Sequence, residues 1–370
     1  MLGPRGTGKT TFLKHFFHPS PVEYIDLLSP DEEDLFARNP GELENRVRAM
    51  QPPGEWVIID EIQRVPRLLD LVHRLIETTP VKFALTGSSG RKLNRGASNL
   101  LAGRAFVNRL HPLTLHELDG VAPLADLLQW GSLPKTVQLA TIEEKREYLR
   151  SYAHTYLREE IAAEQVVRKL DPFRNFLSVA AQCNGQILNA SKIARDVGAD
   201  VKTVQSYFTI LEDTMLGYML PAWERSLRKR QSTRPKFYFF DLGVKRALER
   251  TISQELYEES YGFGNAFEHF VINELVRLND YRRRDFTFNY LRSPSGREID
   301  LVMERPGSPV AFIEIKSTKL VTEEDCAALN AFADDCPDAE PYCISRDIHR
   351  KKIGPTLCIP YTDAAAELGL

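Results

Sequence analysis

Cysteine is sparse in this sequence and follows no pairing pattern. The five cysteines form no CxxC pair and no cluster with histidine along the chain. That spacing weighs against a zinc site and against a disulfide framework, so we expect reduced and mostly buried thiols. They are Cys183, Cys326, Cys336, Cys343 and Cys358.

Long apolar runs are missing as well. The longest runs, such as residues 56–59 and 312–315, are far shorter than the roughly 20 residues that a membrane-spanning helix needs. The N-terminus has no basic segment followed by an apolar stretch and a small-residue cleavage site, so it does not resemble a signal peptide. We therefore expect a cytoplasmic protein with no membrane partner.

A strong charge of one sign is also absent. The formal net charge is −3, so binding to nucleic acid would have to depend on local basic patches and not on the overall charge. The chain has 370 residues, a length that favours two to three domains rather than a single core.

The hydrophobic pattern divides the chain into four parts. Short apolar runs at 22–27, 56–60 and 82–88, with a helical pattern at 68–76, predict an α/β domain with a parallel sheet. A helical lid is predicted next, followed by two short helices that indicate a winged helix-turn-helix and by a last α/β domain. The predicted boundaries are 1–120, 121–184, 185–233 and 234–370.

The sequence opens with the pattern GxxxxGKT of a P-loop. In such a loop Gly3 and Gly8 let backbone N–H groups converge on phosphate oxygens, Lys9 reaches the outer phosphates, and the Thr10 hydroxyl binds Mg²⁺. The alternative is a chance glycine-rich turn. The expected ATP-binding residues are Gly3, Pro4, Arg5, Gly6, Thr7, Gly8, Lys9, Thr10 and Thr11.

Two carboxylates follow the apolar strand at 56–60. Their position predicts that Asp60 binds Mg²⁺ together with Thr10 and that Glu61 is the general base for an attacking water. A third strand leads into the polar residues 86–89, where Ser88 could contact the γ-phosphate or that water. A strand running into a charged loop, or an ordinary strand-end turn, would produce the same letters.

These motifs together resemble one family. The P-loop, Val-Ile-Ile-Asp-Glu-Ile-Gln at 57–63, Leu-Thr-Gly-Ser-Ser at 85–89 and Leu-Ala-Gly-Arg at 101–104 are similar to AAA-type ATPases that carry a C-terminal DUF4143 domain. The resemblance covers nearly the whole chain and implies ATP hydrolysis with Mg²⁺, with a homo-oligomer as one option. It implies that Arg104 neutralises charge on the transferring phosphate; a surface arginine is the competing interpretation.

One feature departs from that family. Its members place a hydrophobic strand before the P-loop, whereas only Met1 and Leu2 precede Gly3 here. The absence of that strand predicts a P-loop without an anchor on its N-terminal side and suggests a start site placed too late.

A second set of carboxylates lies near the C-terminus. Two strands joined by a turn at 306–309 carry Asp300 and the pair Glu314 and Lys316, which alternation places on one strand face. The arrangement fits metal-assisted phosphodiester hydrolysis and resembles the PD-(D/E)xK nuclease motif, with Glu268 on a helix at 266–278 as a third acidic ligand. It implies a second Mg²⁺ or Mn²⁺ site. Two alternatives to an active nuclease site remain: a strand face that is merely charged, and a nuclease-like domain that is kept as a binding platform.

Basic residues gather where DNA would bind. They follow the predicted helix-turn-helix and recur in the last domain. The second helix of the helix-turn-helix offers polar side chains for contacts with DNA. A packing role for the helices and solvated charge is the alternative. These residues are Arg225, Arg228, Lys229, Arg230, Arg234, Lys236, Arg282, Arg283, Arg284, Arg292 and Arg297, with Lys202, Thr203, Gln205 and Ser206 on the second helix.

Two functions are therefore open. The first is an ATPase that drives or regulates DNA binding and processing through the nuclease-like domain. Whether this domain cleaves DNA is a separate question. The second is an ATP-dependent switch whose nuclease-like domain is inactive and only binds nucleic acid or protein.

Overall fold

The protein was analysed as a computed structural model that describes every residue except 19, 21, 51–55, 89–104, 157–169, 224–233 and 294–295. The chain forms two compact units. One comprises Met1–His111 with Asp213–Leu216, and the other comprises Pro112–Glu212 with Gly217–Leu370. No helix within these described residues is both long enough and apolar enough to span a membrane.

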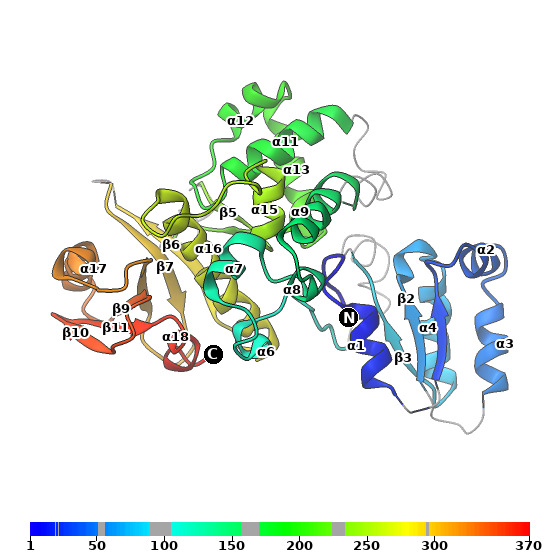
Figure 1. The fold of residues 1–370 in the computed structure, drawn as a ribbon. Helices are drawn as coiled ribbons and strands as arrows, with labels where there is room; N and C mark the ends of the chain where they lie inside the picture. The colour runs from blue at the N-terminus through cyan, green and yellow to red at the C-terminus, as the bar shows by residue number, and fades with distance from the viewer. Residues whose placement is uncertain are drawn as a thin grey trace. The chain divides into compact units, whose positions relative to one another are not determined.

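A parallel sheet with the order β1-β2-β3 organises the N-terminal unit (Figure 1), as the sequence predicted. Its strands are β1 (Val22–Asp26), β2 (Trp56–Asp60) and β3 (Lys82–Leu85). The third strand is shorter than the predicted 82–88, because its ladder with β2 ends at Leu85. The helices are α1 (Lys9–Phe16), α2 (Pro30–Arg38), α3 (Glu42–Ala49), the short 3-10 turn η1 (Ile62–Arg64) and α4 (Leu68–Thr78).

The apolar run of β2 is buried on both faces. Ile58 packs in a cluster with Leu13 of α1, whereas Val57 and Ile59 belong to a second cluster that includes Val72 of α4. Alternation along the strand sends successive side chains to opposite faces, so helices must cover both sides of the sheet. The end of β2 is thereby fixed, and Asp60 lies there.

Residues 1–3 supply part of the pairing that the sequence seemed to lack. Leu2 makes parallel bridges to Gly87 on one side and to Arg109 on the other. The Gly87 N–H donates to the Met1 carbonyl at 3.1 Å and the Leu110 N–H donates to the Leu2 carbonyl at 2.7 Å. The expectation of an unanchored P-loop is therefore wrong in this structure, because backbone hydrogen bonds hold its N-terminal side.

Helices form much of the C-terminal unit before its large sheet. The segment predicted as a lid is helical, and two of its helices begin with capping boxes, Thr114 with Glu117 and Thr141 with Glu144. Its helices are α6 (Leu115–Leu118), α7 (Leu124–Trp130), α8 (Pro134–Gln138), α9 (Ile142–Ser151), the π-helical turn η2 (Tyr152–Tyr156) and α11 (Leu170–Gln182).

Two short helices follow, α12 (Ala190–Val197) and α13 (Val201–Asp213). Gly198 ends α12 with φ 67°, a left-handed conformation that glycine adopts without a steric penalty. Asp200 accepts a hydrogen bond from the Thr203 N–H at 2.8 Å at the start of α13. An antiparallel pair, β4 (Gly217–Leu220) and β5 (Lys236–Phe239), comes next.

The last part of the unit is built on a six-stranded mixed sheet with the order β10-β11-β9-β8-β7-β6. Ile313 and Ile315 of β8 belong to the large core that includes the apolar side of α16, whereas Phe312 packs with Leu329 of α17. The elements are α15 (Leu242–Leu248), α16 (Tyr261–Tyr281), β6 (Thr287–Arg292), β7 (Glu298–Glu304), β8 (Ala311–Lys316), α17 (Glu323–Asp335), β9 (Glu340–Ser345), β10 (Lys351–Ile353), β11 (Thr356–Pro360) and α18 (Ala364–Glu367).

A bulge interrupts the pairing of β6 with β7. Asn289 pairs with Val302 and Leu291 pairs with Ile299, so Asp300 and Leu301 together face the single residue Tyr290. An extra residue bends the strand and changes the direction of its side chains, which is common beside functional sites.

We predict that Gly243→Ala destabilises the C-terminal unit. A Cβ at Gly243 would lie 2.0 Å from the Trp130 carbonyl oxygen, so the backbone of α15 must shift. The expected loss is about 1–3 kcal/mol of unfolding free energy, measured by urea denaturation. Gly262→Ala is the matched control, because Gly262 also occupies the second position of its helix and its Cβ would meet nothing closer than 3.5 Å. Equal midpoints for the two variants would contradict this account.

Candidate functional sites

The P-loop has the backbone that its glycines predict. Gly6 and Gly8 have φ values of 83° and 92°, which most other residues avoid. Gly3 is required for a different reason, because a Cβ there would lie 2.3 Å from the Leu110 carbonyl oxygen. The loop then leads directly into α1, whose first residue is Lys9.

Lys9 is buried against this loop. Its ammonium donates to the carbonyl oxygens of Gly3 at 2.8 Å and Pro4 at 3.2 Å, and it lies 3.9 Å from a carboxylate oxygen of Glu61. Only 5% of the residue is exposed. The position is suited to binding phosphate, since phosphate oxygens can replace these carbonyls as acceptors without any large movement of the loop.

Asp60 is fully buried at the end of β2 and accepts hydrogen bonds from three hydroxyls. Thr10 donates to Oδ2 at 2.6 Å, Tyr24 donates to Oδ2 at 2.7 Å, and Thr86 donates to Oδ1. Burial alone would raise the pKa of Asp60, but these hydrogen bonds hold it below its usual value. Asp60 is therefore held as a carboxylate beside the Thr10 hydroxyl.

Glu61 has φ 58°, an uncommon conformation for a residue with a side chain. Gln63 donates a hydrogen bond to its carboxylate, and Ser88 donates to the same oxygen at 3.2 Å. The Glu61 N–H in turn donates to the Thr86 hydroxyl at 3.0 Å. The backbone strain and these contacts fix the direction of the Glu61 carboxylate, which is what a water-positioning base requires.

The predicted residues Lys9, Thr10, Asp60, Glu61 and Ser88 thus meet at one end of the sheet. The sequence reasoning missed Tyr24 and assigned no role to Gln63, although the order of parallel strands places both near Asp60 and Glu61. A bound Mg²⁺ fits the Thr10 hydroxyl and the Asp60 carboxylate, since both are oxygen ligands and already lie in contact. Arg104 lies outside the described residues.

The residues of the second predicted site all lie in the C-terminal unit. Asp300 lies in the bulge of β7, just before Leu301, where the pairing with β8 begins. Its carboxylate accepts a hydrogen bond from the Ile315 N–H at 2.8 Å. Lys316 donates to Glu314 at 2.7 Å, so the two side chains share a face of β8 as alternation predicted. Glu268 comes from α16, the predicted helix, which is longer than 266–278.

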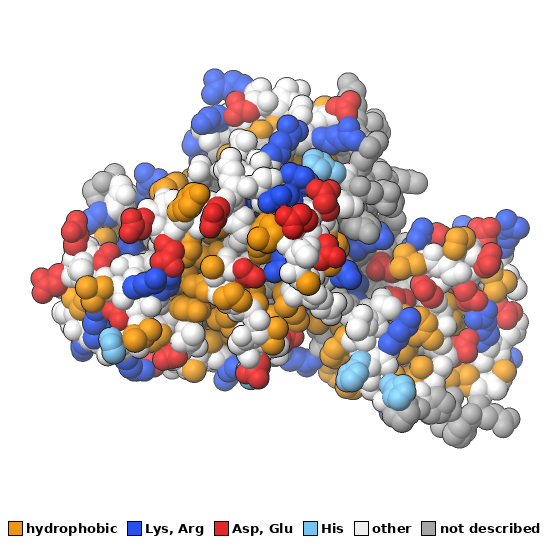
Figure 2. Space-filling model, in the orientation of Figure 1, with side chains coloured by type: hydrophobic (Ala, Val, Ile, Leu, Met, Phe, Trp, Pro, Cys, Tyr) orange, Lys and Arg blue, Asp and Glu red, His pale blue; other side chains and the backbone are white. Residues whose placement is uncertain are grey.

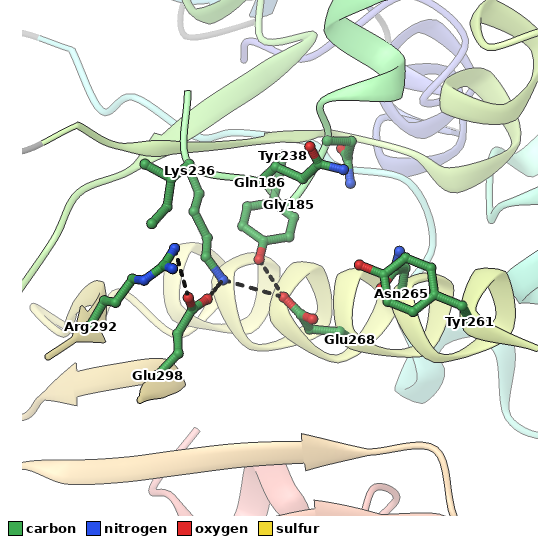
Figure 3. Close-up of a pocket in the computed structure, with 11 residues that line it drawn as sticks. Gly185, Gln186, Lys236, Tyr238, Tyr261, Asn265, Glu268, Arg292 and Glu298 are labelled. Carbon is green, nitrogen blue, oxygen red and sulfur yellow. Dashed lines mark hydrogen bonds and ion pairs between the residues drawn. The ribbon is translucent and has the colours of Figure 1, made fainter. Parts of the chain in front are cut away.

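Lys236 is a member of this site that the sequence reasoning misplaced. It was expected to contact phosphate with the surface arginines, but it is only 3% exposed. Its ammonium lies 2.6 Å from Glu298 and 3.8 Å from Glu268 (Figure 3). Tyr238 donates a hydrogen bond to Glu268 at 2.6 Å, also visible in Figure 3. Lys236 therefore compensates buried acidic charge and is unavailable to a DNA backbone.

A pocket of about 240 Å³ opens beside these residues. It is lined by Lys236, Tyr238, Glu268, Arg292 and Glu298, with polar groups from the turn at 184–186. Arg292 lies 3.8 Å from Glu298, and half of its side chain is exposed. The pocket joins a buried acidic cluster to an accessible arginine.

Burial dominates the electrostatics of the acidic cluster. It raises the pKa of Glu268 to about 7 and that of Glu314 to about 8, and the neighbouring Asp300 charge adds to both effects. Burial likewise raises the pKa of Asp300. One oxygen of Glu314, Oε2, is buried and has no hydrogen-bond partner among the residues that the structure describes. Three carboxyls that resist ionisation and one unsatisfied oxygen are chemically suited to a divalent cation.

The close ligand spacing expected of a metal site is not found among the described side chains of Glu268, Asp300 and Glu314, but it is found among three cysteines. Among the residues that the structure describes, the group of three metal-binding side chains with ligand atoms within 4.8 Å of one another is Cys326, Cys343 and Cys358. All five cysteines are free thiols and three of them are buried, as expected from the sequence. The spacing along the chain did not reveal this cluster, because a helix and two strands bring together residues that are far apart in sequence.

The basic patches are only partly described. Figure 2 shows Lys and Arg side chains interspersed with Asp and Glu on the visible face, without a single basic stripe. On α13, Lys202, Gln205 and Ser206 are exposed, whereas the Thr203 hydroxyl donates to Asp200 at 2.7 Å. Arg282, Arg283, Arg284 and Arg297 are exposed as well. Arg225, Arg228, Lys229 and Arg230 lie outside the described residues.

Comparison with known families finds a match for each of three parts of the chain. Residues 1–119 match the AAA domain, residues 122–255 match a domain of unknown function, DUF8612, and residues 263–363 match another, DUF4143. The chain joins an AAA domain to a C-terminal DUF4143 domain. The AAA match supports a nucleotide-binding P-loop ATPase, and the DUF4143 match contains Glu268, Asp300, Glu314 and Lys316.

Curated relatives match most of the chain. Uncharacterised proteins of Mycobacterium tuberculosis and Mycobacterium bovis are each 28% identical over 322 residues, which is 86% of this chain and 70% of theirs. An uncharacterised protein of Haemophilus influenzae is 24% identical over 276 residues, or 70% of this chain and 65% of that protein.

Two solved structures are similar at a low level. One is the Aeropyrum pernix ORC1 protein in complex with DNA, with a TM-score of 0.27, 14% identity and coverage of 69% of this chain and 88% of that chain. The other is Can2 from Sulfobacillus thermosulfidooxidans with cyclic tetra-adenylate, with a TM-score of 0.23, 12% identity and coverage of 94% and 98%. Such scores carry no argument about function.

The acidic cluster predicts a pH-dependent stability for the DUF4143 domain. Glu268 and Glu314 titrate at about 7 and about 8 in the folded protein, compared with about 4.3 in an unfolded chain. Between these limits the folded state binds more protons, so its unfolding free energy falls as the pH rises. We expect a loss on the order of 6 kcal/mol from pH 5 to pH 8 in the presence of a chelator, measured by urea denaturation.

Glu314→Gln tests the cause of that slope, because glutamine keeps the shape but cannot ionise. The variant should lose less stability over the same pH range than the parent protein. Glu324→Gln is the control, since Glu324 is exposed on α17. A parent protein whose stability increases steadily from pH 5 to pH 8 would contradict the raised pKa values.

Proposed function

We propose that this protein is an ATP-hydrolysing AAA-type enzyme that regulates DNA binding and processing through its DUF4143 domain. The observation that supports ATP hydrolysis best is the contact of Thr10 and Thr86 with Asp60, beside Lys9 and Glu61. These groups come from the P-loop helix and from the ends of two parallel strands, where phosphates bind in such sheets.

Each residue has a defined part in the proposed reaction. The P-loop N–H groups and the Lys9 ammonium bind the ATP phosphates and stabilise the negative charge that develops on them. Thr10 and Asp60 would hold Mg²⁺, which neutralises phosphate charge when bound. Glu61, fixed by Gln63 and Ser88, orients the attacking water and accepts its proton at a carboxylate oxygen.

The DUF4143 domain supports a nuclease-like role on DNA. Glu268, Asp300 and Glu314 would hold a divalent cation, and the Lys316 ammonium lies beside Glu314, where it can stabilise charge on a phosphodiester. The helices α12 and α13 followed by the β4–β5 pair fit a winged helix-turn-helix. Exposed Lys202, Gln205 and Ser206 on α13 would then contact DNA.

A regulatory switch with an inactive nuclease-like domain is the second candidate, and a specific contact favours it. The Lys236 ammonium already supplies positive charge to Glu268 and Glu298 within the acidic cluster. A resident cation of this kind reduces the gain in free energy from binding a divalent metal. In this case ATP would control assembly or binding, and no DNA would be cleaved.

We predict that Lys9→Ala and Glu61→Gln separate ATP binding from hydrolysis. Lys9→Ala removes phosphate contacts, so both ATP binding and phosphate release should be lost. Glu61→Gln keeps the phosphate contacts but removes the base, so phosphate release should fall about 10²- to 10³-fold with ATP binding retained. Arg38→Ala, at an exposed residue of α2, is the control. Unchanged phosphate release in Lys9→Ala would refute the site.

A cleavage assay decides between the two candidates. Linear, nicked and single-stranded DNA are each incubated with the protein and Mg²⁺ or Mn²⁺. If the nuclease-like site is active, at least one of these DNA forms should be cleaved, and Glu314→Ala should abolish the cleavage. The assay is run with and without ATP, and Glu324→Ala serves as the surface control. Failure to cut any DNA form, with ATP turnover intact, would support the regulatory switch.

A further inference from the structure

Three cysteines of the DUF4143 domain meet under α17. Cys343 on β9 and Cys358 on β11 are register partners on neighbouring strands, so their side chains lie on the same face of the sheet. Cys326 belongs to the first turn and a half of α17, which packs on that face. Three separate elements therefore each contribute one thiol to a single cluster.

The spacing of the sulfur atoms suits a single metal ion. The three sulfurs lie within 4.8 Å of one another, and Cys326 Sγ lies 3.8 Å from Cys358 Sγ. An ion at the centre of three thiolates, with metal–sulfur bonds of about 2.3 Å, separates the sulfurs by roughly 4.0 Å. Only small side-chain movements are needed to reach that geometry.

The cluster is buried and is packed by apolar side chains. All three cysteines are 0% exposed, and they pack with Val321 and Ile353. Burial raises the pKa of all three thiols, to about 12 for Cys358. Without an ion they are neutral thiols, and binding requires three S–H groups to release their protons as three sulfur–metal bonds form, with no change in oxidation state.

We propose that Cys326, Cys343 and Cys358 form a trigonal site for a soft monovalent ion of the Cu(I) class. Thiolate ligands in an apolar setting select soft ions over Mg²⁺ or Ca²⁺. Structural zinc almost always takes four ligands, whereas the group found among the described side chains has three. A three-coordinate soft ion therefore fits this cluster better than zinc.

The test is an anaerobic titration of the full-length, reduced protein with Cu(I), in the presence of bicinchoninate as a competing chelator. One Cu(I) per chain should be retained against the chelator. Cys326→Ala and Cys358→Ala should lose this retention, because two thiolates remain. Cys183→Ala with Cys336→Ala is the matched control and should retain the ion, since both residues lie outside the cluster and are partly exposed.

X-ray absorption at the copper edge of the parent protein provides a readout that does not depend on a variant folding. Three equivalent sulfur neighbours are expected. One or two sulfur neighbours, no ion retained by the parent protein, or equal retention in Cys326→Ala would each overturn the proposal. Neither ATP hydrolysis nor DNA cleavage enters this result, so the site stands or falls separately from the proposed function.

Discussion

The N-terminal unit depends on the stabilisation of one buried carboxylate. Asp60 ends a strand whose apolar residues are covered on both faces, so its charge lies inside the protein and must be compensated there. Hydroxyls from Thr10, Tyr24 and Thr86 do this, and they connect α1, β1 and the segment after β3 to β2. The network that makes the burial of Asp60 tolerable also places its carboxylate and the Thr10 hydroxyl next to each other at the P-loop.

The DUF4143 domain compensates buried carboxylates in a different way. Ammonium groups take part here as well as a hydroxyl, with Lys236 between Glu298 and Glu268, Lys316 beside Glu314, and the Tyr238 hydroxyl on Glu268. The compensation is incomplete, because Glu268 and Glu314 keep raised pKa values and one oxygen of Glu314 finds no partner in the described part of the chain. The AAA domain thus keeps Asp60 ionised, whereas the DUF4143 domain keeps Glu268 and Glu314 close to protonation.

Much of both sites could be predicted from the sequence because local patterns determine them. Strand alternation placed Glu314 and Lys316 on one face, and the order of parallel strands brought Asp60, Glu61 and Ser88 to the P-loop. Long-range pairing set the rest. Lys236 looks like part of a basic surface stretch in the sequence, and only the pairing of β5 with β4 and its packing near α16 bury it. The cysteine cluster depends on the register of β9 and β11, which no local pattern reveals.

Register also connects the two clusters of the DUF4143 domain. Glu314 on β8 is the register partner of Cys343 on β9, and Cys343 is the partner of Cys358 on β11, so one row of the sheet runs from the acidic cluster to the thiols. The Glu314 charge contributes to the raised pKa values of Cys326 and Cys343. The interaction is reciprocal, since negative charge gained by the thiols disfavours ionisation of Glu314. The protonation of Glu314 therefore depends on the state of both clusters, and the residue couples them electrostatically.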